Sequence, residues 1–437
     1  MSLQQTLRIG IVGMGTGGLA SAIFIQRLGH HVTIFEKTSQ NDLESPVGAG
    51  LGIQPIGLTV LKRLGILNDI LSHGAKIEHL HSLTREGKTV LDLKYADFND
   101  KLYGIGLHRD ALFTSLYNQI YNNDENENIN IVTNANVKNV EIVNGKKGSY
   151  ISMVDGKKDG PFDLIIIADG RESIRKNMKH VKSYEKKYKY GCLWSIIPDK
   201  KNDFVNKKTL YQRLDSAKTM LGLLPTGTSP KQKNKELVSL FWSCKVSDFS
   251  SIKAKGLENW KEEVYRLEPK TFNLLNEIKN FNQLIEATYS DTYMPKLFDE
   301  TTNTAFIGDC AHATSPQLGQ GANLALVDAW VLSNAIQSSI NNNNNSKTMS
   351  TSVHEALYKY NEERKWRLRF YQLNSRLLTP VFQSDSKTIG WLRDLTLGPL
   401  CYFPPTRLQM LTVLCGAQNN GIPWTTIPEE EYLGYTL

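Results

Sequence analysis

The sequence predicts an α/β fold in which a nucleotide-binding domain is interleaved with an antiparallel-sheet domain and followed by a C-terminal helical segment. Three observations predict it. A complete β-α-β pattern opens the chain, short β-rich runs separated by turn residues occupy its middle, and the first pattern returns after residue 300. With 437 residues the chain is long enough for about two or three domains.

The first 36 residues carry the β-α-β pattern. Residues 8–13 are a short apolar run that stops at glycine, apolar residues recur at helical spacing over 19–28, and 31–36 form a second apolar run. Such a unit joins two parallel strands through a helix, so a parallel, doubly wound sheet is expected. Further strands are expected at 129–133, 148–154 and 163–168.

The middle of the chain has a different character. Short β-rich runs at 191–197, 220–224 and 238–242 alternate with turn residues, which predicts an antiparallel sheet. A buried strand at 304–308 and a helix over 320–337 then resume the first pattern. A long amphipathic helix is predicted over 353–376.

These patterns divide the chain into six segments. We expect nucleotide-binding parts at 1–78, 101–185 and 293–376, sheet-domain parts at 79–100 and 186–292, and a helical tail at 377–437. The Asn-rich stretch 341–345 is interpreted as a surface loop. The apolar region 390–416 of the tail is expected to pack on the rest of the chain, with a dimer face or a membrane-surface anchor as alternatives.

Composition and charge argue against several classes of protein. No uninterrupted apolar run reaches the ~18 residues that span a bilayer, and the N-terminus is too polar for a secretion signal, so we expect a cytoplasmic protein. The five cysteines form no C-x-x-C pair, which argues against a disulfide framework or a metal site. The net charge of +7 comes without a nucleic-acid motif, so no nucleic-acid partner is expected.

The segment G-M-G-T-G-G at 13–18 fits the dinucleotide-binding pattern G-x-G-x-x-G. Gly13 would form the tight turn, Gly15 would admit a pyrophosphate to the backbone, and Gly18 would let the helix pack on the strand. The motif follows a strand and opens a helix, and Glu36 ends the next strand, where a carboxylate accepts hydrogen bonds from a ribose. This context predicts a dinucleotide site.

Two later segments place polar residues at strand ends. A-D-G-R-E-S-I-R at 168–175 puts Asp169 at the carboxyl end of a buried strand, where ligands collect in open α/β folds. In T-A-F-I-G-D-C-A-H-A-T-S-P-Q-L-G-Q-G-A-N at 304–323, a strand leads to Asp309 and Pro316 stiffens the loop. The next helix begins near Gly321, with its first N–H groups facing a ligand in that loop.

The three motifs, in this order, resemble those of the FAD-dependent aromatic hydroxylases, the para-hydroxybenzoate hydroxylase-like single-component flavoprotein monooxygenases, over roughly residues 7–380. The resemblance implies a Rossmann-like FAD-binding domain and assigns FAD contacts to the three motifs and to loops near them. The implied FAD-binding residues are Gly13, Gly15, Thr16, Gly17, Gly18, Glu36, Lys37, Gly50, Gly52, Arg109, Val137, Asp169, Gly170, Asp309, Pro316, Gly319, Gln320, Gly321, Ala322 and Asn323.

The resemblance also implies a reaction. NADPH or NADH would reduce the FAD, O₂ would add to form a hydroperoxide, and the distal oxygen would hydroxylate or epoxidise an aromatic or polycyclic substrate. The helix N-terminus near 321–323 would stabilise the charge of reduced flavin by about 0.3 to 2 kcal/mol. The β-rich middle domain would exclude water from the reaction.

The candidate substrate-pocket residues lie on or near the middle strands: Cys192, Trp194, Tyr211, Met220, Gly222, Phe241, Trp242, Tyr293 and Pro295. Packing in a sheet core is the alternative for each of them. Several family members with carboxylate substrates carry an arginine where this chain reads W-S-I-I-P at 194–198, so we expect a larger, uncharged substrate. The catalytic base is left open among Tyr211, Tyr293 and His312, because the choice requires geometry.

Other functions also stay open at this point. A flavin-dependent halogenase, dehydrogenase or reductase would keep the fold, although W-S-I-I-P is only a faint echo of the halogenase segment G-W-x-W-x-I-P. A FAD-bound interaction protein without turnover would use the basic patch at 175–189 and the C-terminal tail. A monomer and a homodimer are equally compatible with the sequence.

Overall fold

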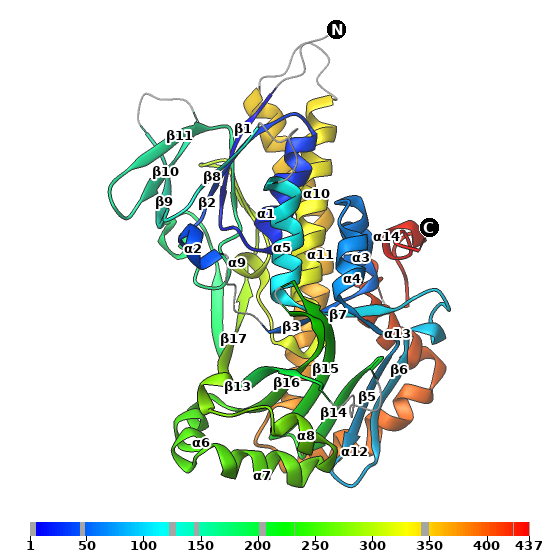
Figure 1. The fold of residues 1–437 in the computed structure, drawn as a ribbon. Coiled ribbons are helices and arrows are strands. Elements are labelled where there is room, and N and C mark those ends of the chain that lie inside the picture. Colours follow the sequence, from blue (N-terminus) through cyan, green and yellow to red (C-terminus); the bar gives the residue numbers. More distant parts are fainter. Residues whose placement is uncertain are drawn as a thin grey trace.

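The computed structural model describes residues 6–43, 49–121, 128–143, 148–200, 207–230, 232–341, 349–422 and 424–436. Figure 1 shows two large β-sheets at opposite ends of the molecule, with helices α10 (Gly321–Asn341) and α11 (Met349–Phe382) running lengthwise. Most of the Asn-rich stretch 341–345 lies outside the described residues.

The first sheet is the parallel sheet expected for the nucleotide-binding domain. Its strand order is β18-β19-β12-β1-β2-β8, and among these strands only β18 runs antiparallel to its neighbour. The helices α1 (Thr16–Arg27), α5 (Arg109–Tyr121) and α10 pack beside it, so all four residues of β12 are buried. The strands are β1 (Arg8–Val12), β2 (His31–Phe35), β8 (Ile129–Val132), β12 (Leu164–Ile167), β18 (Phe298–Asp299) and β19 (Thr304–Phe306).

An antiparallel ribbon, and not a helix, connects β8 with β12. It consists of β9 (Val137–Ile142), β10 (Ser149–Met153) and β11 (Lys158–Phe162). Ile151 and Phe162 of the ribbon lie against Gly10 of β1, where an added Cβ would approach these side chains to 2.9 and 3.3 Å. The ribbon therefore takes the place that a helix has in a doubly wound sheet, and the strand expected at 148–154 belongs to it.

The second sheet has seven strands in the order β17-β13-β16-β15-β14-β5-β6. Neighbours are antiparallel except β5 and β14, which pair in parallel. The strands extend well beyond the predicted apolar runs, because polar residues continue the pairing at both ends. Their bounds are β5 (His79–Thr84), β6 (Thr89–Lys94), β13 (Tyr184–Pro198), β14 (Thr209–Asp215), β15 (Thr219–Ser229), β16 (Gln232–Lys245) and β17 (Ile285–Tyr293). We propose that the chain divides into two domains at the boundaries expected from the sequence.

The two faces of the seven-stranded sheet have different coverings. Helices α6 (Phe249–Lys255), α7 (Leu257–Leu267) and α8 (Phe272–Leu275) supply the outer cover, and Trp260 of α7 shares an apolar cluster with Leu240 and Trp242 of β16. A small sheet of β3 (Gly50–Ile53), β7 (Gly104–His108) and β4 (Ala75–Ile77) lies on the inner face. A Cβ added to Gly50 would lie only 2.6 Å from the Cβ of Ser239.

The C-terminal helices join the two ends of the molecule. The helix predicted over 353–376 lies within α11, which packs along α10, and α12 packs on β6. All five cysteines are buried and free. None of the helices in the described ranges combines the length and the apolar character that crossing a membrane requires. The remaining helices are α2 (Gln40–Leu43), α3 (Pro55–Arg63), α4 (Leu67–His73), α9 (Asp309–His312), α12 (Lys387–Tyr402), α13 (Pro404–Cys415) and α14 (Glu429–Tyr432).

Candidate functional site

The glycine motif forms a tight turn between β1 and α1. Gly13 has φ +98°, and a Cβ there would lie 2.6 Å from the carbonyl oxygen of Ala168. A Cβ on Gly18 would lie 2.0 Å from the carbonyl oxygen of Gly13, so this helix can approach the turn only without a side chain. Gly15 is exposed and has no atom within 4 Å of such a Cβ, which leaves the N-terminus of α1 accessible between Thr16 and Gly18.

The carboxylate of Glu36 lies at the edge of this turn. One of its oxygens accepts a hydrogen bond from the backbone N–H of Met14 at 2.8 Å, and the other accepts two from Thr38. A carboxylate has about four acceptor positions, so a further hydroxyl can still donate to it. Lys37, the next residue, is exposed. The segment that leads into buried Val137 lies next to Glu36, because the N–H of Ala135 donates to the carbonyl of Glu36 at 2.8 Å.

Asp169 lies behind the same turn, at the end of β12. Its Oδ2 accepts a hydrogen bond from the N–H of Ile174 at 2.8 Å, whereas Oδ1 is buried without a hydrogen-bond partner in the described structure. Burial raises the pKa of the Asp169 carboxyl. Gly170 follows with φ +77°, a conformation that glycine adopts without strain. The unpartnered oxygen is a ready acceptor for a ligand hydroxyl or for a donor brought by a ligand.

Asp309 and the start of α10 face each other across the third motif. Asp309 is exposed at the first position of α9, and its Oδ1 lies 3.9 Å from the position of a Cβ on Gly321. The loop between them contains Pro316, which is exposed, and Gly319, whose φ is +60°. No acidic residue lies in the first turn of α10, so the positive end of this helix is available for an anionic group.

Two side chains of this loop are used for packing. The Gln320 amide is buried and donates to the carbonyls of Val413 and Leu414 at 3.0 and 2.9 Å, so it binds α13. The Asn323 amide accepts from the N–H of Gln54 at 2.9 Å and donates to the carbonyl of Gly52 at 3.1 Å. At these two positions a cofactor can be contacted through the backbone, as the sequence predicts for the first N–H groups of this helix.

Gln54, which the sequence motifs do not include, lies among the candidate site residues. It is buried between β3 and the loop, its Oε1 accepts a hydrogen bond from Tyr95 at 2.5 Å, and its Nε2 lies 3.5 Å and 3.7 Å from the positions of Cβ atoms on Gly52 and Gly319. The available signal was its place between a glycine-rich strand and Pro55, the first residue of α3. Arg109 begins α5 next to β7 and is exposed, and Gly50 and Ala322 complete the expected set around β3 and α10.

His312 takes part in a buried ionic network and is not free to act as a base. Its Nε2 lies 2.5 Å from Oδ2 of Asp328, which also accepts from the N–H of Gly308 at 2.9 Å, while Arg364 donates to Oδ1 at 2.7 Å. Burial alone would raise the pKa of Asp328, but His312 and Arg364 outweigh it and hold the pKa at about 2. The network holds the Gly308–Asp309 turn in place through the hydrogen bond from the N–H of Gly308 to Asp328.

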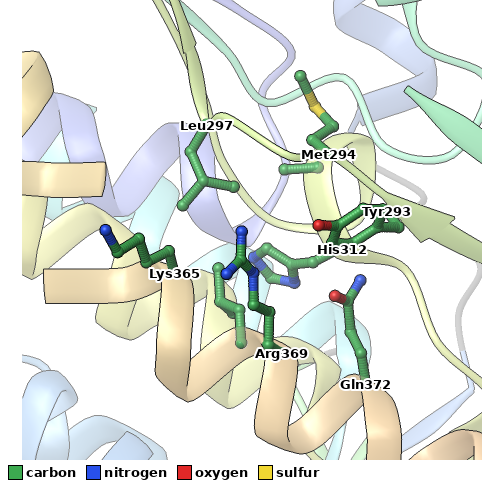
Figure 2. A pocket seen from close by; sticks show the side chains of 9 residues that line it. Tyr293, Met294, Leu297, His312, Lys365, Arg369 and Gln372 are labelled. Atoms are coloured by element: carbon green, nitrogen blue, oxygen red, sulfur yellow. The ribbon is translucent and has the colours of Figure 1, made fainter. Parts of the chain in front are cut away.

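A small pocket lies on the far side of His312, between the end of β17 and α11. Figure 2 shows His312 and Tyr293 facing it together with Arg369 and Gln372 of α11. The Tyr293 ring stacks with Tyr184, their centroids 6.1 Å apart. Pro295, two residues further on, is half-buried at this same end of β17. Tyr293 therefore lines this pocket, and Pro295 lies next to it without being one of its lining residues.

The inner face of the seven-stranded sheet gathers the other pocket residues. Trp194 of β13 lies directly opposite Phe241 of β16, and the Phe241 ring covers Gly222, where a Cβ would lie 1.9 Å from the ring. Met220 shares an apolar cluster with Phe382 of α11, against which Phe241 also packs. The thiol of Cys192 accepts a hydrogen bond from Tyr289 at 2.8 Å. These side chains face the side on which β3 lies.

Tyr211 and Trp242 point to the opposite face. Trp242 packs with Trp260 beneath α7, and the Tyr211 hydroxyl donates to buried Glu268, which follows α7. Successive strand residues alternate between faces, so Trp242 cannot share a face with Phe241. The structure thus corrects the grouping of both residues with the substrate pocket, and it leaves Tyr211 no access to the inner face.

The fold and these residues fit FAD. The turn at Gly13–Gly18 leaves the backbone accessible to a pyrophosphate. The Glu36 carboxylate can accept a further hydrogen bond from a ribose hydroxyl, and the buried Oδ1 of Asp169 has no hydrogen-bond donor in the described structure. The N-terminus of α10 carries positive potential where the negative charge of a reduced flavin would develop. Fold and site together define a FAD-binding oxidoreductase.

Comparisons with known proteins give the family. Residues 6–363 match the family described as FAD binding domain. The FAD-dependent monooxygenase atmM of Aspergillus flavus is 24% identical over 416 residues, which cover 87% of this chain and 80% of that protein. The chain belongs to the FAD-dependent aromatic hydroxylase family, and it is an FAD-dependent monooxygenase.

Solved structures share the fold over nearly the whole chain. The tetrameric form of 2-methyl-3-hydroxypyridine-5-carboxylic acid oxygenase has a TM-score of 0.71 at 22% identity and covers 93% of this chain and 96% of its own. Klebsiella pneumoniae HpxO, complexed with FAD and uric acid, has a TM-score of 0.73 at 16% identity, with 94% and 97% covered. At these identities the likeness concerns the fold.

Proposed function

We propose that this monooxygenase takes electrons from NADPH or NADH and hydroxylates or epoxidises an uncharged aromatic or polycyclic substrate. The observation that carries the proposal is the inner face of the seven-stranded sheet. Over 192–196, 220–224 and 239–243 this face presents Cys192, Trp194, Ile196, Met220, Gly222, Leu224, Ser239, Phe241 and Ser243. None of these side chains is charged, and a carboxylate buried against them would lose several kcal/mol without a cation.

The chain's own residues have separate tasks in this proposal. Glu36 would accept hydrogen bonds from the ribose of FAD, Asp169 and Asp309 would accept those of its hydroxylated linker, and α10 would direct its N-terminus at the ring. Bound FAD would supply the electron transfer and the activation of O₂. Trp194 and Phe241 would hold a flat substrate by stacking and exclude water around it.

The relatives support an aromatic substrate class. The two structures named above are an oxygenase of a hydroxypyridine carboxylic acid and a protein in complex with uric acid, both ring compounds. In the present chain the inner-face positions given above carry no charged side chain, which is why an uncharged ring compound is preferred.

A turnover experiment tests the proposal. The FAD-loaded protein is mixed with NADPH or NADH and a panel of phenols, polycyclic aromatics and small benzoates, while coenzyme and O₂ consumption and product mass are followed. We expect larger uncharged compounds to accelerate coenzyme oxidation and to gain the mass of one oxygen atom. Acceleration by benzoates alone would refute the substrate class, and a bound flavin that neither coenzyme reduces would refute the electron donor. Halide-dependent products would point to a halogenase instead.

A further inference from the structure

Helix α12 is built with its small side chains inward. Gly390 faces Ala217, whose backbone nitrogen would lie 3.0 Å from an added Cβ, and Gly398 faces Thr89, whose carbonyl oxygen would lie at 2.4 Å. Arg393, on the same inward side, is buried and donates to the carbonyl of Val381. Gly390, Gly398, Leu397 and buried Cys401 therefore make the contact between α12 and the sheet domain, and Arg393 binds α11.

The outward side of α12 is apolar. Trp391 is 64% exposed and Leu395 56% exposed, and Phe403, which follows the helix, is 57% exposed. These residues are separated by four or eight positions, so they lie on one face and form a single stripe along the helix. We call this set the α12 stripe: Trp391, Leu392, Leu395, Pro399, Tyr402 and Phe403. A surface helix of a globular protein normally has the reverse arrangement.

The α12 stripe is part of a wider concentration of exposed apolar side chains. Eleven of the eighteen large apolar side chains that are exposed in the described part of the chain lie within residues 366–424. They come from α11, α12, α13 and the segment after α13: Trp366, Leu373, Leu377, Trp391, Leu392, Leu395, Tyr402, Phe403, Leu408, Ile422 and Trp424. Such a concentration on one segment marks an interaction surface.

The charged side chains around the α12 stripe indicate which kind of partner it binds. Lys387 begins α12, Lys218 adjoins the residue that Gly390 contacts, and Lys88 adjoins the residue that Gly398 contacts. All three lysines are exposed, and no ion pair within 4.0 Å engages their amines in the described structure. The single acidic residue of α12, Asp394, is paired with Arg393 at 2.7 Å. Acidic side chains also lie at this border, because Asp92 accepts from the Tyr402 hydroxyl at 2.8 Å, Asp385 pairs with Lys245 at 2.7 Å, and Glu86 lies two residues before Lys88. To this border the three lysines add amines that form no ion pair in the described part of the chain.

We propose that α12 docks on an anionic lipid surface, with the α12 stripe in the headgroup region and the three lysines on the lipid phosphates. Tryptophan, tyrosine and phenylalanine favour this interface, and an interfacial helix combines an apolar face with flanking cations. Figure 1 places α12 at the lower edge of the molecule, where a flat surface can reach it. A second copy of the chain fits less well, because pairing the stripes would bring two lysine borders together.

Vesicle binding by the FAD-loaded full chain tests this inference. The protein is sedimented with vesicles of phosphatidylcholine alone and of phosphatidylcholine mixed with phosphatidylserine. We expect strong binding to the mixed vesicles, and at least about a tenfold loss in a variant with Trp391→Ser, Leu395→Gln and Phe403→Ser. A Tyr265→Ser, Phe272→Ser variant is the matched control, since these two exposed residues lie on α7 and α8.

Further measurements separate the outcomes. Retention of FAD by the stripe variant shows that it is folded, and replacing Lys88, Lys218 and Lys387 by glutamine should abolish the preference for phosphatidylserine. The inference is overturned if the wild-type protein stays in the supernatant with mixed vesicles, or if the control variant loses binding as much as the stripe variant. A lipid-free dimer that the stripe variant fails to form would also overturn it, in favour of a second copy.

Discussion

Replacing Gly15 by alanine should separate cofactor binding from folding. The position has φ −77° and ψ −172°, which alanine adopts, and no atom lies within 4 Å of the new methyl group. Gly15 is the N-cap of α1, where alanine is less favourable than glycine, so the free energy of unfolding of the cofactor-free protein should fall by only about 1 kcal/mol or less. The methyl group would occupy the approach of a pyrophosphate to the backbone. Losing one N–H bond to a charged phosphate costs about 1.5 to 3 kcal/mol, which weakens FAD binding roughly 10- to 150-fold.

Two measurements on the same variant check this reasoning. Urea unfolding of the cofactor-free protein gives the change in stability, and quenching of flavin fluorescence on titration gives the dissociation constant. Gly18→Ala is the contrasting variant, because its methyl group would lie 2.0 Å from a backbone oxygen and should destabilise the fold by about 1 to 3 kcal/mol or more. If Gly15→Ala binds FAD within about twofold of the wild type, the pyrophosphate does not approach this turn.

Three further outcomes are expected. The pKa of Asp328 is about 2 in the folded protein against an ordinary value of 3.8, so its ionised form contributes roughly 2 kcal/mol of stability above pH ~4, and this contribution is lost as the pH falls toward 2. Urea unfolding against pH should lose this component in Asp328→Asn, and an unchanged profile would contradict the network. Asp309→Ala should weaken FAD binding about tenfold with little change in stability, which flavin titration would disprove by finding full affinity. Tyr211→Phe should leave KM for the substrate unchanged whereas Trp194→Ala should raise it about tenfold, and steady-state kinetics showing the reverse would return Tyr211 to the pocket.

Local patterns were enough to predict the glycine turn between β1 and α1. The roles of Gly13, Gly15 and Gly18 depend on one turn and on the strand and helix that flank it, and the structure has the expected close approaches. The parallel sheet followed from the same short-range patterns. By contrast, the strand expected at 148–154 does not join the parallel sheet, and it forms a ribbon because its pairing partners lie within the same segment.

The direction of individual side chains could not be read from the sequence. Trp242 and Phe241 are adjacent, so only the register of β16 decides which one faces β3. Gln320 and Asn323 lie in the expected loop, but their amides are taken by α13 and β3, which are far away in the chain. Gln54 was missed for the same reason, since its partners come from three separate segments.

The amide of Asn323 fastens β3, the Pro316–Gly321 loop and the first turn of α10 to one another. Gly57 lies against this amide: a Cβ at position 57 would lie 2.1 Å from Oδ1 of Asn323, so a larger residue there would clash with it. These three segments, against which the flavin ring would lie, are therefore held together as one rigid unit. We therefore expect β3, the loop and the first turn of α10 to keep their relative positions when a substrate enters beside the seven-stranded sheet.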